Sequence, residues 1–199
     1  MKFSSLTAIV VASLGLASQA SSAILFADNF QTNLSQFSSN TSGVIVTTPV
    51  GGGNALSFTQ TIGGGDIFTA NTFSSPTGNF HISFEYLGTC GASSCGGFLG
   101  FNNPAETWLA GSGNYPTAHP ITETGGWQTI SFDFASSSPI RLKLEDFTGA
   151  NDGGAANNVY FRNLVLSGAV PEPASWALMI AGFAMTGVAA RRRRKTVSA

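Results

Sequence analysis

Apolar and polar residues alternate over several stretches in the middle of the chain. The alternation is clearest over 80–86, 130–134 and 140–144, where every second side chain is Phe, Ile, Leu or Tyr. A period of two is typical of β-strands with one buried and one exposed face. Shorter strands are predicted at 24–30, 44–48, 55–60, 66–70, 97–101 and 159–166. The last is apolar on both faces except at Arg162 and Asn163, where a β-bulge or a ligand contact is expected.

Turn-forming sequences rich in Gly, Pro, Ser, Asn and Asp separate the predicted strands. They occur at 51–54, 63–65, 75–78 and 151–154. Many short strands with regular turns, and no helical period of useful length, predict an all-β domain, an antiparallel β-sandwich or jelly roll. The stretch 102–123 fits neither period and is predicted to be a long irregular loop. Because loops of that length are uncommon unless they are functional or mobile, this stretch is the first place in which to look for a site.

The amino-terminal residues have the three parts of a signal peptide. Lys2 supplies a positive charge, residues 6–16 are mainly apolar, and small residues follow them. Cleavage is predicted after Ala23, with Ala20 as the alternative site. We assign 1–23 to a signal peptide rather than to an uncleaved helix, because the apolar run is short for a membrane span and small residues follow it directly.

The carboxyl-terminal residues combine an apolar run with a basic cluster. Residues 176–190 carry no charge, and at about 1.5 Å per residue they are short for a hydrocarbon core of about 30 Å. The basic residues that follow are Arg191, Arg192, Arg193, Arg194 and Lys195. Trp176 at one end and this cluster at the other suit the two membrane interfaces, so a transmembrane helix with its basic end in the cytoplasm is predicted.

A short proline motif precedes the apolar run. It reads Pro171-Glu172-Pro173 and is followed by Trp176 and Ala177. Each proline fixes its own φ and favours extended geometry in the residue before it, which makes the motif stiff and accessible to a protease. The order of motif, apolar helix and basic stop resembles the PEP-CTERM family of bacterial surface-sorting signals, in the variant Pro-Glu-Pro-x-x-Trp-Ala. The alternative is a plain carboxyl-terminal anchor helix.

This resemblance implies a route of export. An exosortase-type membrane enzyme would recognise Glu172 and its flanking prolines, cut there, and release the domain to the cell surface or the extracellular matrix. In this family such sorting is linked to exopolysaccharide and biofilm production in Gram-negative bacteria. We therefore expect an exported protein that is transiently anchored in the inner membrane. Its predicted parts are a signal peptide at 1–23, a β-sandwich domain at 24–169 and a sorting tail at 170–195.

The whole-chain net charge of −1 hides an acidic exported part. Between residues 24 and 169 there are three basic residues, Arg141, Lys143 and Arg162, against nine acidic ones, which gives this part a net charge of −6. An acidic, lysine-poor domain cannot neutralise a phosphate backbone, so nucleic acid is not an expected partner.

Both cysteines, Cys90 and Cys95, lie in this exported part. An oxidising compartment and an even count favour a disulfide between them. A zinc site would need further ligands, and the two histidines, His81 and His119, are far apart in the sequence. A redox pair usually has two intervening residues at a helix start, whereas four small residues intervene here. A structural disulfide that tightens a turn is therefore predicted.

Parts of the central domain resemble strands of carbohydrate-binding-module-like jelly rolls. The segments are 26–30, 126–130 and 158–166. In such domains an acidic residue near the closing strand often helps to bind a structural calcium, but Asn163 stands where Asp is frequent. Oxygen ligands for calcium could come from Asp28, Glu145, Asp146 and Asp152. We favour the alternative that these acids are solvated on turns and strand faces, and we predict no metal and no cofactor.

Glycan binding needs exposed aromatic rings with polar groups beside them. Trp108 and Tyr115, both within the predicted irregular loop, are the best candidates for a stacking platform. The alternative is that they cap one end of the core beneath that loop. Trp127 opens a strand and is assigned to the core or the rim of the sandwich.

Catalysis is not predicted. Glycoside hydrolysis needs two carboxyl groups that face one cleft, and the four Glu residues of the domain show no recognisable catalytic spacing. A Gly-x-Ser-x-Gly nucleophile elbow is absent, and the triple glycines lack the Lys and the helix of a phosphate-binding loop. We predict an exported surface or exopolysaccharide-matrix protein without catalytic activity. A carbohydrate-binding module is the second interpretation and a glycoside hydrolase the third.

Overall fold

The computed structural model divides the chain into two compact units, of which one, Ser21–Val170, contains every strand. The residues described are 21–38, 42–59, 65–91, 94–103, 105–112, 117–147, 156–170, 177 and 179–187. In the other unit, Ala177 and residues 179–187 are helical. Within these described residues, no helix combines the length and the hydropathy that a membrane crossing requires.

Most of the predicted sorting tail lies outside the described residues. This holds for Pro171, Glu172, Pro173 and Trp176, for the basic residues 191–195, and for the predicted signal peptide up to Ala20.

The larger sheet, sheet A, is built around one long central strand. In order across the sheet its strands are β10 (Gln128–Ala135), β6 (Asn79–Gly88), β12 (Val159–Val170), β4 (Asn54–Phe58) and β3 (Gly43–Thr47). A sixth strand, β1 (Ser21–Asp28), pairs with the later part of β12. All of these pairs are antiparallel.

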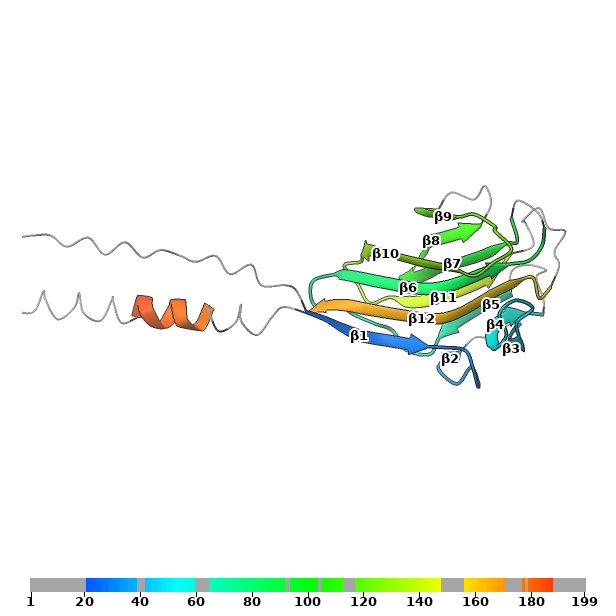
Figure 1. Ribbon diagram of the computed structural model, residues 1–199. Helices are drawn as coiled ribbons and strands as arrows, with labels where there is room; N and C mark the ends of the chain where they lie inside the picture. Colours follow the sequence, from blue (N-terminus) through cyan, green and yellow to red (C-terminus); the bar gives the residue numbers. More distant parts are fainter. Residues whose placement is uncertain are drawn as a thin grey trace, which may run out of the picture. The chain divides into compact units, whose positions relative to one another are not determined.

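Sheet B packs against sheet A as the second layer (Figure 1). Its strands in order are β2 (Phe37–Ser38), β5 (Gly65–Thr69), β11 (Arg141–Asp146), β7 (Gly97–Asn103), β8 (Ala105–Ser112) and β9 (His119–Ile121). The pair β8–β9 is parallel and the other pairs are antiparallel. The predicted all-β sandwich of jelly-roll type is confirmed.

The core lies between the two sheets and follows the period-two pattern of the sequence. Ile82 and Phe84 on β6 are fully buried, as are Leu142 and Leu144 on β11 and Phe161 on β12. Each intervening residue on these strands faces the outer side of its sheet. Aromatic rings fill much of the space, and the rings of Phe84 and Phe161 lie 6.1 Å apart. The alternation therefore determines which face of each long strand is buried.

The prediction of an irregular loop over 102–123 was wrong. This stretch contains β8 and β9, which extend sheet B by two strands. Its periodicity does not predict β8 because the first three residues of this strand are exposed while four residues in a row, Leu109 to Ser112, are buried. The pairing of β7 with β8 also shifts register between Leu99 and Gly100. A strand with such an irregularity does not alternate regularly, so periodicity does not reveal it.

The predicted bulge in β12 is confirmed. Its register against β6 shifts between Arg162 and Val165. Asn163 within this bulge has a φ of 52°, a left-handed conformation that Asn tolerates better than most residues. Its side-chain amide donates a hydrogen bond of 3.1 Å to Glu85 on β6. The bulge thus directs the Asn163 side chain to the outer face of sheet A.

The predicted disulfide between Cys90 and Cys95 is confirmed, with 5.4 Å between their Cα atoms. Hydrogen bonds hold the same loop. The backbone N–H of Cys95 donates to Glu123 at 3.1 Å, and the hydroxyl of Tyr86 donates to the same Glu123 oxygen at 2.8 Å. The hydroxyl of Ser112 accepts from two further backbone N–H groups, those of residues 96 and 97. The disulfide is therefore one of several restraints on this loop.

Replacing both cysteines by Ser should lower the free energy of unfolding by about 2 kcal/mol or less, because closing a loop of so few residues removes little chain entropy. For a domain of this size we expect the melting temperature to fall by no more than about 8 °C. Thermal unfolding followed by circular dichroism measures this. Loss of the folded β signal at room temperature would contradict the prediction, since it would make the disulfide essential to the sandwich.

Candidate functional site

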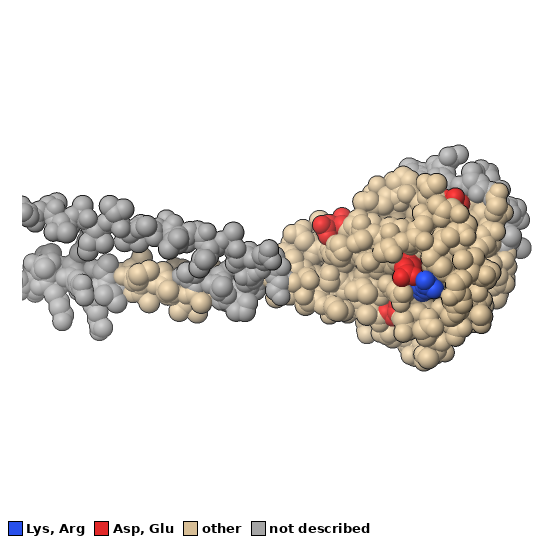
Figure 2. Space-filling model, viewed as in Figure 1, with Lys and Arg blue, Asp and Glu red and all other residues tan. Residues whose placement is uncertain are grey.

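Charged side chains are sparse on this domain. On the face shown in Figure 2, most of the described surface consists of uncharged residues, and acidic and basic groups occupy only small parts of it. Such a surface makes any cluster of charged and aromatic residues conspicuous. Among the described residues, such clusters occur on the outer faces of both sheets.

The first cluster lies on the outer face of sheet B. Leu142 and Leu144 of β11 face the core, so the alternate residues Lys143 and Glu145 face outward. Side chains from the neighbouring strands surround them. These are Asp66 and Phe68 on β5, Phe98 on β7, and Glu106 and Trp108 on β8.

The ammonium group of Lys143 is the centre of this cluster. Its Nζ lies 2.6 Å from Glu106, 3.1 Å from Asp66 and 3.4 Å from Glu145. Its side chain is only 5% exposed. A buried ammonium is costly unless it is paired, and here three carboxylates from three strands surround it. The cluster therefore ties β5, β8 and β11 together on the outer side of the sheet.

Two aromatic rings cover the same lysine. Nζ lies 4.6 Å from the centre of the Trp108 ring and 5.5 Å from that of Phe68, so both rings are within the range of cation–π attraction. Trp108 can lie across β7 because residue 100 is a glycine. A Cβ atom there would fall 2.3 Å from the carbonyl oxygen of Thr107 and 2.8 Å from the Trp108 ring. Gly100 thus makes room for the indole.

Burial and the neighbouring charges set the protonation of the cluster. Burial and, to a smaller extent, the nearby Asp66 raise the pKa of Glu145 to about 7, although Lys143 acts to lower it. Burial also raises the pKa of Asp66. For Lys143, burial acts to lower the pKa, but Glu106, Glu145 and Asp66 raise it overall, so the amine remains an ammonium. The group that titrates near neutral pH is therefore Glu145.

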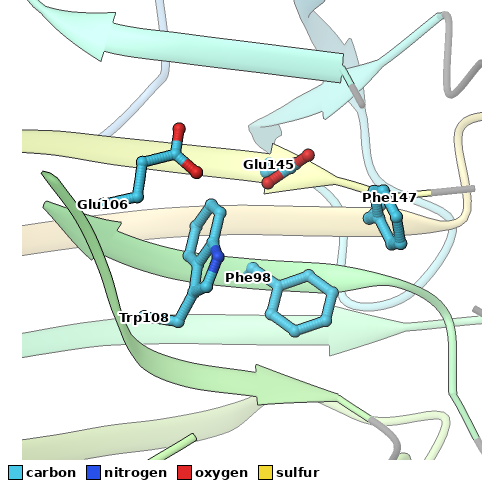
Figure 3. Close-up of a pocket in the computed structure, with 5 residues that line it drawn as sticks. All are labelled: Phe98, Glu106, Trp108, Glu145 and Phe147. Atoms are coloured by element: carbon cyan, nitrogen blue, oxygen red, sulfur yellow. The ribbon is translucent and has the colours of Figure 1, made fainter. Parts of the chain in front are cut away.

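A small pocket of about 130 Å³ opens beside the cluster (Figure 3). Its lining consists of Phe98, Glu106, Trp108, Glu145 and Phe147. The Phe98 and Trp108 rings lie 5.5 Å apart, and Phe147 approaches Phe98 edge-on at 6.4 Å. Aromatic faces beside carboxylate oxygens can stack against a sugar ring and accept hydrogen bonds from its hydroxyl groups. The pocket combines both kinds of group.

Of the two residues predicted to form a glycan platform, Trp108 lines this pocket, on a strand rather than in a loop. Tyr115 lies outside the described residues. Sequence reasoning missed Lys143, Glu106 and Phe98 as members of the site. They belong to three strands, and the pairing of β7 with both β8 and β11 brings them together.

Two of the acids considered for calcium, Asp28 and Glu145, have different partners on different sheets. Glu145 pairs with Lys143, whereas Asp28 accepts hydrogen bonds from the backbone of Phe30 and the side chain of Gln36. Asp28 lines a different hollow of about 450 Å³, which Asn163 also lines. Asp146 is buried next to Glu145, and Asp152 lies outside the described residues. Within the described parts, no group of three or more His, Cys, Asp or Glu side chains could hold a metal ion.

The outer face of sheet A holds a second cluster with a different chemistry. The hydroxyl of Ser131 lies 2.9 Å from Nε2 of His81, and Nδ1 of His81 lies 2.6 Å from Asp133. This is the order of contacts of a Ser–His–Asp triad, built from β6 and β10. The side chains of His81 and Asp133 are 49% and 86% exposed. Catalytic triads of this kind act in water-excluded sites that stabilise the developing charge. Because these side chains are exposed, we interpret their contacts as hydrogen bonds of the protein surface.

Trp127, assigned to the core or the rim, packs on the outer face of sheet A. Its ring contacts a small cluster of Ala55, Leu87 and Tyr160, separate from the main core. The guanidinium of Arg162 lies 3.8 Å from the centre of this ring and also bonds to Glu85. The indole N–H donates to the carbonyl oxygen of residue 50 at 2.9 Å. Trp127 is therefore a packing residue on the outer face of sheet A.

The titration of Glu145 predicts a pH dependence of stability. The pKa of this group is about 7 in the folded protein, above its ordinary value of 4.5, so the folded state holds the proton more tightly than the unfolded chain. Stability should therefore fall as pH rises from about 4.5 through 7. The variant Glu145→Gln should show a shallower fall, measured as the denaturant midpoint between mildly acidic and mildly alkaline pH.

Glu85→Gln is the matched control. Partial burial acts to raise the pKa of Glu85, but hydrogen bonds from Arg162 and Asn163 lower it overall. Its contribution is lost as pH falls through that lowered pKa, so the decline near neutral pH should persist in Glu85→Gln. Equal slopes in the wild type and in Glu145→Gln would contradict the assignment.

Comparison with known proteins gives a likeness of fold for the sandwich and a motif match for the carboxyl terminus. No curated protein matches the chain. Among solved structures, the CBM22-1 xylan-binding domain of Xyn10C from Paenibacillus barcinonensis is 13% identical and covers 78% of this chain and 100% of its own, with a TM-score of 0.49. A carbohydrate binding module from lichenase 5A of Cellvibrio mixtus, in complex with cellotriose, is 15% identical (75% and 100% covered, TM-score 0.42).

A third structure is the K1 cleaved adhesin domain of Lys-gingipain from Porphyromonas gingivalis, 8% identical (75% and 99% covered, TM-score 0.47). At such identities the likeness concerns the fold alone.

At the carboxyl terminus the predicted resemblance to the PEP-CTERM family of sorting signals is confirmed. Residues 169–194 match the PEP-CTERM protein-sorting motif, and the protein is therefore an exported one that is sorted through its carboxyl-terminal tail and transiently anchored in the membrane before release to the surface.

Proposed function

We propose that this chain is a non-catalytic protein of the bacterial surface or exopolysaccharide matrix, and that it contacts polysaccharide through the pocket on the outer face of sheet B. The observation that carries the first part is the sorting motif at 169–194. An exosortase-type membrane enzyme is the partner that this motif implies. The sandwich is then the part delivered, and its surface is where a function outside the cell has to be found.

The glycan contact is supported by the chemistry of the pocket. Trp108 presents an aromatic face, and Glu106, with 46% of its side chain exposed, supplies accessible acceptor oxygens beside it. A carboxylate has about four acceptor positions, and the bond to Lys143 uses one of them. Sugar hydroxyl groups can use the others. Tyr115 remains a predicted second platform residue.

A hydrolytic role is less well supported by the same geometry. Glu106 and Glu145 both line the pocket, so two carboxyl groups are present. Glycoside hydrolysis needs them on opposite sides of the scissile bond, one as acid and one as base or nucleophile. Here both contact the same ammonium group, Nζ of Lys143. A binding role uses this arrangement as it stands, whereas hydrolysis would require Lys143 to move.

Processing of the tail gives the first test of this function. Mass spectrometry of the mature protein from wild-type cells should find a carboxyl terminus within or near 171–173, without residues 191–199. Replacing Glu172 by Ala should leave the tail attached and the protein in the membrane fraction, because it removes the charged group of the predicted recognition motif. Asp133→Asn, which changes the same charge on the sandwich, is the control and should be processed normally. A wild-type protein that retains 191–199 would contradict the sorting route.

Binding of the producer's own exopolysaccharide gives the second test. The mature protein should be retained by immobilised polysaccharide, and Trp108→Ala should reduce retention at least fivefold, because stacking on one aromatic ring is lost. Thr129→Ala, an exposed position on the other sheet, should leave retention unchanged. Release of reducing ends would instead favour a hydrolase. Equal retention of wild type and Trp108→Ala would contradict the glycan contact at this pocket.

A further inference from the structure

We propose that the pocket on the outer face of sheet B prefers glycans that carry free amino groups, such as glucosamine units, to neutral and acidic glycans. This inference rests on the proposed function, because it concerns the same pocket and names the class of sugar that it takes. The alternatives are a neutral sugar, bound by stacking and hydroxyl contacts alone, and a uronate or other acidic sugar.

The pocket has more negative than positive charge beside it. Three carboxylates, those of Asp66, Glu106 and Glu145, share the one ammonium of Lys143. The next basic side chain, Arg141, lies over the Phe68 ring, 4.9 Å from its centre, and neither residue lines the pocket. Its guanidinium donates to the carbonyl oxygen of Thr69 at 2.7 Å and to the hydroxyl of residue 38 at 2.6 Å. An acidic sugar placed in the pocket would meet like charges, whereas an amine would meet the opposite charge.

Lys143 shows how an amine is held at this surface. Its ammonium lies against the Trp108 ring at 4.6 Å and bonds to Glu106 at 2.6 Å. Both residues also line the pocket. A protonated sugar amine that enters the pocket meets the same two kinds of group, an aromatic ring and a carboxylate. The contacts of Lys143 with Trp108 and Glu106 thus already use the chemistry that we propose for the ligand.

Glu145 would respond to such a ligand. Burial and the neighbouring Asp66 make its ionised form costly, so its pKa is about 7. A second ammonium nearby favours the ionised carboxylate and would lower that pKa. A neutral sugar brings no such charge. An amine is therefore the ligand that offsets the unfavourable charge on Glu145 and Asp66.

The size of the pocket limits how much of a chain it takes. Its volume of about 130 Å³ is below the range of about 300–1,000 Å³ typical of small-molecule sites. The pocket therefore suits one sugar ring at a time, at a chain end or at a single residue along a chain. Selectivity has to come from the substituents of that ring, of which the amino group is the one that the charges favour.

The test compares three soluble probes on the mature protein: oligomers of glucosamine, oligomers of N-acetylglucosamine and oligomers of galacturonic acid. Calorimetry in near-neutral buffer of low ionic strength should give at least tenfold tighter binding of the glucosamine probe than of its N-acetylated counterpart, and no binding of the galacturonate. Added salt should reduce the preference, because it screens the charges. Equal affinities for the first two probes would overturn the proposal.

Two variants with the same change of net charge separate the pocket from the general acidity of the domain. Glu106→Gln removes a carboxylate of the pocket, and Asp133→Asn removes an exposed one on the other sheet. We expect Glu106→Gln to weaken glucosamine binding at least fivefold and Asp133→Asn to have little effect. Equal weakening by both would overturn the proposal in favour of bulk charge attraction.

The variant Trp108→Ala distinguishes failure of this inference from failure of the proposed function. Binding of the N-acetylated probe or of the native polysaccharide that is lost in Trp108→Ala, without a preference for the amine, would overturn the amino-sugar inference and leave the proposed function standing. Absence of binding by every probe and by the native polysaccharide would overturn both. Circular dichroism of each variant checks that the sandwich is folded.

Discussion

The pairing of β12 with its neighbours on both sides holds the larger sheet together. Its register runs from Val159 opposite Gly88 to Gly168 opposite Phe80 on β6, and on the other side Val170 lies opposite Ser21 of β1. Its buried residues, such as Phe161 and Leu166, belong to the hydrophobic core between sheet A and sheet B. Because three strands of sheet A pair with β12, its position determines where each of them lies.

The end of β12 also connects the fold to the sorting tail. Val170 is its last paired residue, and residue 171 is a proline, which has no backbone N–H with which to extend the ladder. The matched sorting motif begins at residue 169, so it overlaps the end of the strand. A cut within Pro171–Pro173 would therefore leave every strand pair of the sandwich intact.

The sequence contains strong signals for the regular part of the fold and weak ones for the site. Period two predicts β6 and β10 because each has one face in the core and the other largely in solvent. It predicts β11 because the outward residues Lys143 and Glu145 are charged, although both are buried. It misses β8, in which four consecutive residues are buried, and β2, which has only two residues. The compartment and the even cysteine count predict the disulfide without any knowledge of the fold.

The site could not be predicted as a whole because strand order, not sequence order, assembles it. Trp108 was recognisable as an aromatic residue among polar neighbours, but its partner Lys143 is 35 positions away in the sequence and one strand, β7, lies between them. Glu145, considered as a calcium ligand, instead pairs with that lysine. Long-range pairing of this kind leaves no local pattern, so a sequence alone offers the residue types and not their contacts.

The strand that leads into the sorting tail and the residues that line the pocket belong to different sheets, and this bears on how the protein would act. The strand that leads into the tail, β12, belongs to sheet A, whereas every residue that lines the pocket belongs to sheet B or directly follows it. Cutting the tail after β12 therefore removes no part of the pocket. On the proposed function, the glycan contact is complete while the protein is still anchored and is unchanged after release. Sorting would then decide where the bound polysaccharide is held, and the charges around Lys143 would decide which polysaccharide it is.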